Sequence, residues 1–201
     1  MNKILITTEK EIPVIKYTGC ANCNLPCGKR EKNVPKRGCC WYDVELDLYD
    51  IKNIIDRDKS IFIDIISKHP YIIDADLNVI YFSANKINNN ENRENKVCIF
   101  FEKDKGCSLP VYARPFICRV TLCPHLRKYI DTKEYIKIKQ VNNLIYRHRI
   151  KYLDLLNREL YERGIEMNKI DLIIEILESL PKLKPLEIQN AEVYVKSNCL
   201  I

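Results

Sequence analysis

Residues 20–40 read CANCNLPCGKREKNVPKRGCC, and this stretch carries five of the ten cysteines in the chain. Four more lie in residues 98–123, CIFFEKDKGCSLPVYARPFICRVTLC, so two short windows hold nine of the ten. The first window begins with the spacing Cys20-x2-Cys23-x3-Cys27. A two-residue gap allows two sulfurs to face one ion while the backbone between them folds over it. The clustering therefore predicts a fold organised around a cysteine metal site.

Length and composition favour a metal site over disulfide bonds. A chain of 201 residues can bury a hydrophobic core as one domain without covalent staples. Residues 1–7 lack the long apolar region and the cleavage site of a secretory signal. Asp64 interrupts the apolar residues 61–66, which are too few to span a bilayer. We therefore expect a cytoplasmic protein with no membrane partner, in which thiols stay reduced and available to a metal.

The charge distribution says little about partners. The net charge of +6 is a mild excess, and the lysines are dispersed among acidic residues. Such a balance permits an anionic partner without requiring one, so nucleic acid is not an expected partner. The densest positive stretch outside the two windows, residues 147–151 (RHRIK), predicts the solvated face of a helix.

The hydrophobic pattern predicts a small α+β fold that is rich in helix, with short β-hairpins and loops around the cysteine metal site. Asp47 is the expected N-cap of a helix that ends near Lys68. The other expected elements are strands at 4–7 and 12–17, hairpins that join 71–73 to 79–82 and 97–101 to 107–109, helices that end at Gly164 and before Pro181, and a strand at 191–195. We assign residues 1–130 to a cysteine-cluster metal-binding region. Residues 131–201 form a C-terminal helical region that we expect to pack on the same domain.

A second motif, Arg114-Pro115-x-x-Cys118-Arg119, lies within the second window. Together with the clustered cysteines, it resembles the YkgJ-type cysteine-cluster family, whose CxxCxxxxCC domain is regarded as zinc- or iron-chelating and which includes flagellin lysine N-methylases. The family pattern runs from clustered cysteines that end in a Cys-Cys pair, through a helix, to a hairpin with a cysteine on each side and an Arg-Pro-x-x-Cys-Arg box. The resemblance covers the chain from the first window to the end of the second.

This chain departs from the family pattern in its first window. Residues 28–38 separate Cys27 from the Cys39-Cys40 pair. Cys27 is therefore either an added ligand or the first half of a displaced pair. The candidate metal ligands are the nine clustered thiols: Cys20, Cys23, Cys27, Cys39, Cys40, Cys98, Cys107, Cys118 and Cys123. Neither window alone offers four ligands at standard spacing, so we expect the two windows to meet in the fold, and we expect Cys199 to lie away from the site.

Arg114 and Arg119 flank Cys118 and are the candidate cofactor-binding residues. Their guanidinium groups can offset thiolate charge and donate N–H groups to sulfur, which tunes a redox potential. If the segment is helical, Arg114 and Cys118 share one face at a four-residue interval. The alternative is that both arginines pair with ordinary acids such as Glu102.

An iron–sulfur cluster is favoured slightly over zinc. The chain has only one two-residue knuckle, whereas the cysteines of the second window are nine, eleven and five positions apart, which suits ligands gathered by a folded hairpin and helix. His125, two positions after Cys123, is a further candidate ligand by proximity, and a surface role is an equal alternative.

Three functions remain open at this point. The first is a cytoplasmic metal-binding protein that carries an iron–sulfur cluster, or zinc, and has a redox or protein-modification role. The second, implied by the resemblance, is an S-adenosylmethionine-dependent protein-lysine methylase. Only five glycines and no Gly-rich strand–loop–helix motif argue against a doubly wound methyltransferase domain. The third is a structural zinc domain whose C-terminal helices bind a protein partner.

Overall fold

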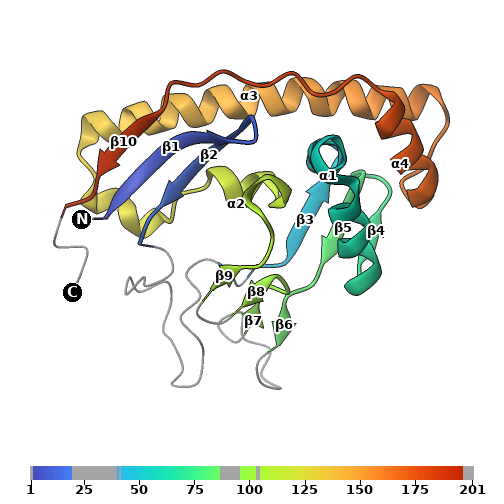
Figure 1. Cartoon of the computed structure of the whole chain (residues 1–201), viewed down its shortest axis with the longest axis horizontal. Helices are drawn as coiled ribbons and strands as arrows, with labels where there is room; N and C mark the ends of the chain where they lie inside the picture. The colour runs from blue at the N-terminus through green and yellow to red at the C-terminus, as the bar shows by residue number, and fades with distance from the viewer. Residues whose placement is uncertain (1, 20–39, 41, 87–95, 103–104, 197–201) are drawn as a thin grey trace.

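A long helix, α3 (Thr132–Glu162), runs along one edge of the molecule, with the sheets and the shorter helices on one side of it (Figure 1). The computed structural model describes residues 2–19, 40, 42–86, 96–102 and 105–196. The predictions for five cysteines lie outside these residues: Cys20, Cys23, Cys27, Cys39 and Cys199. The described residues form four α-helices and short antiparallel sheets, which confirms the small α+β fold class.

The first sheet joins the two ends of the described chain in the order β10-β1-β2. β1 (Lys3–Glu9) and β2 (Ile12–Tyr17) form an antiparallel hairpin. The two turn residues, Lys10 and Glu11, have φ values of 46° and 66°. Positive φ at both central positions gives a two-residue turn whose twist matches the strands. β10 (Ala191–Tyr194) pairs with the other edge of β1, so the strand predicted near the C-terminus is confirmed.

The hairpin of the second sheet and helix α1 are as predicted, whereas the strand that precedes α1 was not predicted. β3 (Val44–Asp47), β5 (Val79–Phe82) and β4 (Ile72–Asp74) form an antiparallel sheet in the order β3-β5-β4. α1 (Leu48–Lys68) begins after Asp47, whose side chain accepts the N–H of Asp50 at 2.9 Å, so the predicted N-cap is confirmed. Asp58 has non-helical angles (φ −164°, ψ 91°) and kinks the helix near its middle.

The second predicted hairpin is shorter than expected. β8 (Phe101–Glu102) pairs with β9 (Gly106–Cys107), while β7 (Lys96–Val97) pairs instead with β6 (Asn85–Lys86). The separation of β7 from β8 has a local cause. The N–H of Phe101 donates to the carbonyl of Cys98 at 2.9 Å, which closes a turn where a continuous strand was predicted.

The remaining helices bound the candidate site and its supports. They are η2 (Val111–Ala113), α2 (Phe116–Val120), η3 (Pro124–Tyr129), α3 and α4 (Ile170–Ser179). α3 starts well before the apolar positions that indicated it, because Asp131 caps its first turn by accepting the N–H of Lys133. Gly164, with φ of 62°, follows the end of α3, and α4 ends before Pro181 as predicted.

Two hydrophobic clusters form the interior, and α3 contributes to both. Leu156 and Leu160 pack in the cluster around α1, α4 and the second sheet. Ile138 and Ile145 pack in the cluster around the first sheet and α2. Among the described residues, no helix is both long enough and apolar enough to cross a bilayer.

Candidate functional site

A backbone contact joins the two cysteine windows. The N–H of Cys98 donates to the carbonyl of Cys40 at 3.0 Å. Cys98 is a buried member of the hydrophobic cluster around α1, and Cys40 and Cys107 pack against the same cluster. The end of the first window therefore lies beside the start of the second.

The other two described cysteines lie in different surroundings. Cys118 is exposed on α2, and Cys123 is half-buried against the hydrophobic cluster of the first sheet. Within the ranges the structure describes, no group of three or more His, Cys, Asp or Glu side chains is arranged to hold a metal ion. Any ligand set that includes the described thiols must therefore draw on residues outside the described ranges, and the joint ligand set of the two windows stays a prediction.

The backbone around Arg114 differs from the helical arrangement considered for it. Pro115 restricts the residue before it to extended angles, and Arg114 has φ −71° and ψ 144°. α2 begins only at Phe116, so Arg114 and Cys118 do not share a helix face. The Nε of Arg114 instead donates to the carbonyl of Leu109 at 3.0 Å, which ties the start of the Arg-Pro motif to the segment that follows Cys107.

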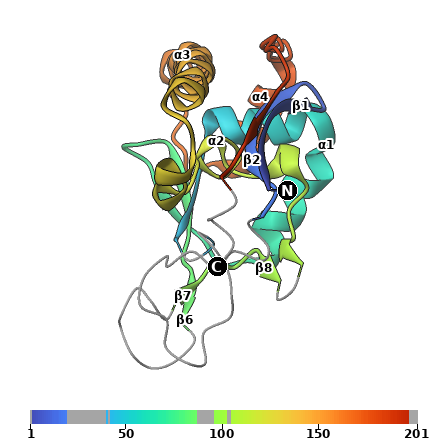
Figure 2. The same ribbon diagram turned by 90° about the vertical axis from the view of Figure 1, so that its left-hand side faces the viewer.

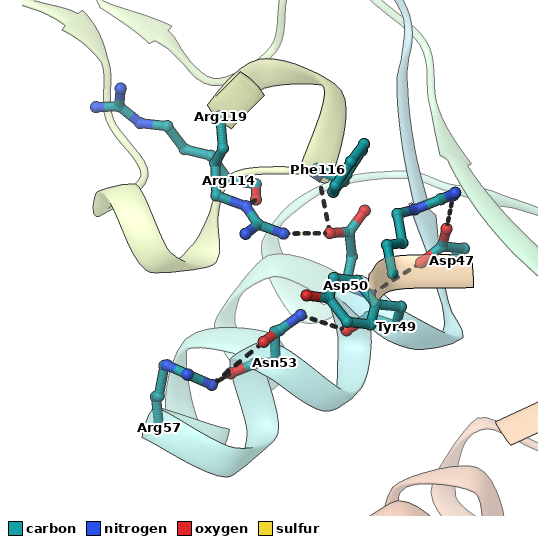
Figure 3. A network of polar contacts seen from close by, with 9 residues as sticks. Asp47, Tyr49, Asp50, Asn53, Arg57, Arg114, Phe116 and Arg119 are labelled. Carbon is teal, nitrogen blue, oxygen red and sulfur yellow. Dashed lines mark hydrogen bonds and ion pairs between the residues drawn. The ribbon is translucent and has the colours of Figure 1, made fainter. Parts of the chain in front are cut away.

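Arg119 is held by a carboxylate that the sequence did not single out. Its Nη2 donates to Oδ1 of Asp50 at 2.9 Å, and its Nε donates to the carbonyl of Arg114 at 2.9 Å. The side chains of Arg119 and Asp50 are only 1% and 4% exposed. Figure 3 shows the guanidinium directed toward the start of α1. Arg119 thus pairs with an acid, as the alternative proposed, although the acid is Asp50 and not Glu102; a role beside a thiolate stays a prediction.

Asp50 also fixes the start of α2. Its Oδ1 accepts the N–H of Phe116 at 2.8 Å, and this is the first residue of α2. One carboxylate therefore bonds to both the first backbone N–H and the Arg119 side chain of the helix that carries Cys118. Such a double contact sets the position and the rotation of α2 against α1, because each bond constrains a different point on the short helix.

A second ion pair extends this network to α3. Asp47, the N-cap of α1, accepts a hydrogen bond from Nη2 of Arg149, and the guanidinium of Arg149 lies 4.9 Å from the ring centroid of Phe116. On the opposite side, Arg57 donates to the side chain of Asn53 at 3.3 Å and to the carbonyl of Lys10 at 2.9 Å. Polar contacts from α1 therefore reach α2, α3 and the β1–β2 turn.

Burial changes the ionisation of this network. Burial, with repulsion from Asp47, raises the pKa of Asp50 to about 7, although Arg119 acts in the opposite direction. Burial also raises the pKa of Tyr49 and lowers the pKa of His148. Two guanidinium atoms, Nη1 of Arg119 and Nε of Arg149, are buried without a hydrogen-bond partner in the described part of the chain. The network thus places charged groups in the interior, where removal of either the cation or the anion of a pair lowers the stability of the fold.

Sequence reasoning missed Asp50 and Arg149 as members of this network. Asp50 stands in the first turn of a predicted helix, where an acid is ordinary, and Arg149 stands in a basic stretch assigned to solvent. The one available signal was the helical interval between Arg149 and the apolar positions Ile145 and Tyr152, which places the arginine on the inward face of α3.

Comparisons of the chain with protein-family models, with curated proteins and with solved structures found no match.

Proposed function

We propose that the chain is a metal-binding protein that holds an iron–sulfur cluster on cysteines from both windows and has a redox or protein-modification role. The observation that supports this most is the hydrogen bond from Cys98 to Cys40, because it brings together two windows that are 58 positions apart in the sequence. Neither window has a standard four-ligand spacing alone, so their meeting supplies the condition that a shared site requires.

The surroundings of the described thiols fit the proposed group. Cys98 is 8% exposed beside Phe100, which is 3% exposed, and Cys40 and Cys107 contact the same apolar cluster. An apolar shell limits solvent access to bound thiolates and helps to set a reduction potential. An iron–sulfur cluster, when bound, supplies one-electron transfer. In this proposal, Cys98 and one of Cys40 and Cys107 contribute ligands, and Cys20 and Cys23 complete a set of four.

The contacts of α2 support a fixed position for the Arg-Pro motif. Arg114 is tied to the carbonyl of Leu109, two positions after Cys107, and Arg119 is tied to Asp50. Cys118 lies between the two arginines, so both ends of its segment are anchored. These anchors hold the backbone around Cys118 in a defined position, as the segment of a metal ligand requires.

The experiment is metal analysis of the full chain purified without oxygen. The proposal expects a brown protein with iron and acid-labile sulfide in stoichiometric amounts, and with an absorption band that reduction bleaches. A colourless protein with stoichiometric zinc would replace the cluster by the structural zinc alternative. Equilibrium dialysis with labelled S-adenosylmethionine on the same sample tests the methylase alternative directly.

Two cysteine variants make the test specific. Cys98→Ala should abolish iron retention, whereas Cys199→Ser, a change outside both windows, should leave it unchanged. Circular dichroism of each metal-free variant checks that the helices still form. Full iron content in folded Cys98→Ala, or the absence of any stoichiometric metal in the wild-type protein, would refute the proposal.

A further inference from the structure

One face of the middle of α3 carries a groove that no other described element lines. A shallow groove of about 540 Å³ follows this face, and its described lining residues come from α3 alone. Three large side chains along it are strongly exposed: Leu144 by 48%, Tyr146 by 51% and Leu155 by 43%. Figure 2 shows α3 end-on at the margin of the molecule. Leu144 and Leu155 lie on one side of the helix, and Tyr146 lies on the other side. Exposed apolar side chains that border one surface are a feature of interaction sites.

The cations on this face have no carboxylate partner within the described ranges. No ion pair at 4.0 Å or less involves Arg147, Lys151 or Arg158. The two ends of the same helix behave differently. Lys137 pairs with Glu134 at 2.7 Å, and Arg163 pairs with Glu159 at 3.1 Å. One cation near each end of α3 is therefore paired, whereas the three cations of the middle are not, and the one acid among the described lining residues of the groove is Asp154.

The order of side chains around the helix gives this face its character. Arg147, Lys151 and Arg158 are four and seven positions apart, intervals that return to the same side of a helix. Leu144 and Leu155 lie along one border of this basic stripe, and Tyr146 and Ile150 lie along the other. Residues 144–158 extend about 21 Å at the helical rise of 1.5 Å per residue. The face is thus a stripe of three cations and one acid, Asp154, with a net charge of +2, between two apolar borders and about four turns long.

We infer that this face of α3 docks an acidic amphipathic helix of another protein. A row of Glu or Asp on such a helix would meet the basic stripe, and its flanking apolar side chains would meet the two borders. The inference is independent of the metal proposal, because no cysteine lies in α3.

The same order of side chains disfavours other occupants. A second copy of the chain would set one basic stripe against another, and an antiparallel pair centred on Lys151 would place that lysine against itself. Helices that lie on membranes carry their apolar residues in the centre of the buried face and their cations at its borders, which is the reverse of the order here. A nucleic acid would use the three cations and leave both apolar borders without a contact.

The test measures binding of a synthetic peptide to the full chain by fluorescence anisotropy. The probe is a labelled helical peptide of about 18 residues, long enough to cover the face, with a row of glutamates between two rows of leucines. A second peptide has lysine at every glutamate position. We expect saturable binding of the acidic peptide, at least about tenfold weaker binding of the lysine peptide, and weakening of the acidic complex between about 50 mM and about 300 mM salt.

Matched variants on the same helix make the result specific. Arg147→Glu/Lys151→Glu should weaken binding of the acidic peptide at least about tenfold, and Leu155→Ala should weaken it several-fold. Lys137→Glu/Arg163→Glu makes the same change in net charge outside the face and should leave binding within about twofold. Equal loss in both double variants, or binding of the two peptides with equal affinity, would overturn the inference. So would tighter binding to phosphatidylserine vesicles or to a duplex oligonucleotide, or a dimer in sedimentation that Arg147→Glu/Lys151→Glu abolishes.

Discussion

Replacement of Arg119 by methionine tests the buried network most directly. Methionine keeps much of the apolar stem and removes the guanidinium, so it leaves Asp50 buried without its cation. The Nη2–Oδ1 distance is 2.9 Å, and the two side chains are 1% and 4% exposed. Removal of one partner from a buried pair of this kind costs about 3–5 kcal/mol. We expect Arg119→Met to lower the free energy of unfolding by this amount near pH 8.

The cost should depend on pH in a defined direction. Burial and Asp47 raise the pKa of Asp50 from 3.8 to about 7. Between these two pH values the native state therefore binds more protons than the unfolded state. The contribution of this carboxyl to the free energy of unfolding then falls as pH rises. Arg119 opposes the shift, so its removal raises the pKa of Asp50 further. The pH range over which stability falls then extends above 7, at about 1.4 kcal/mol for each added pH unit. The difference between wild type and variant should therefore grow by about 1 kcal/mol between pH 6 and pH 8.

Urea unfolding at the two pH values, followed by circular dichroism, measures both quantities. The control is Arg163→Met, which breaks an exposed pair on α3 whose side chains are 47% and 41% exposed. This control should cost no more than about 0.5 kcal/mol at either pH. The reasoning fails if Arg119→Met costs less than about 1 kcal/mol near pH 8, or if its cost is the same at both pH values.

Three further predictions concern buried polar groups, including a second buried ion pair between Lys52 and Asp56 of α1. Asp47→Ala should cost about 2–3 kcal/mol in urea unfolding, because it removes the N-cap of α1 and the partner of Arg149, and Asp47→Asn should recover about 1 kcal/mol by restoring the cap alone. Lys52→Met should lower the free energy of unfolding by about 3–5 kcal/mol, because Lys52 and Asp56 are only 1% and 6% exposed. The double variant Lys52→Met/Asp56→Leu should be more stable than the single variant, because it leaves no unpaired buried charge. The opposite order in thermal unfolding would contradict this. Burial lowers the pKa of His148 in the native state. As pH falls below 6.5, the unfolded state therefore binds a proton at this histidine before the native state does, which reduces stability. His148→Gln should accordingly reduce the loss of stability between about pH 7.5 and about pH 5.5. Parallel pH profiles for the His148→Gln variant and the wild type would show that this histidine does not contribute.

Local rules were sufficient for most of the elements. Asp47 was identified as an N-cap because a short acid before an apolar helical repeat satisfies free N–H groups, and the structure has that bond. The hairpin of β4 and β5 followed from two apolar strands around a polar turn, in which Asn78 has a φ of 53°. Both predictions depend on contacts between residues close in sequence, which a single sequence contains in full.

The failures in the second window have an equally local origin. A run from Val97 to Phe101 reads as one strand, yet a turn bond between Phe101 and Cys98 divides it. Likewise, Arg114 was considered for a helix that Pro115 delays by two residues. In each case a backbone constraint at one position overrode an apolar pattern that was continuous through it.

The chemical groups of this protein and most of its local structure can be read from its residues: two windows of thiols, an Arg-Pro motif, and a small α+β fold with an identifiable helix start at Asp47. Which of these groups meet is set by the tertiary structure. It placed Cys98 against Cys40, gave Arg119 to Asp50 and turned Arg149 inward while Arg147 and Lys151 stayed outside. The physical reason is that pairing across 58 to 102 positions depends on how whole elements pack, and the spacing of residues within one segment carries no record of that packing.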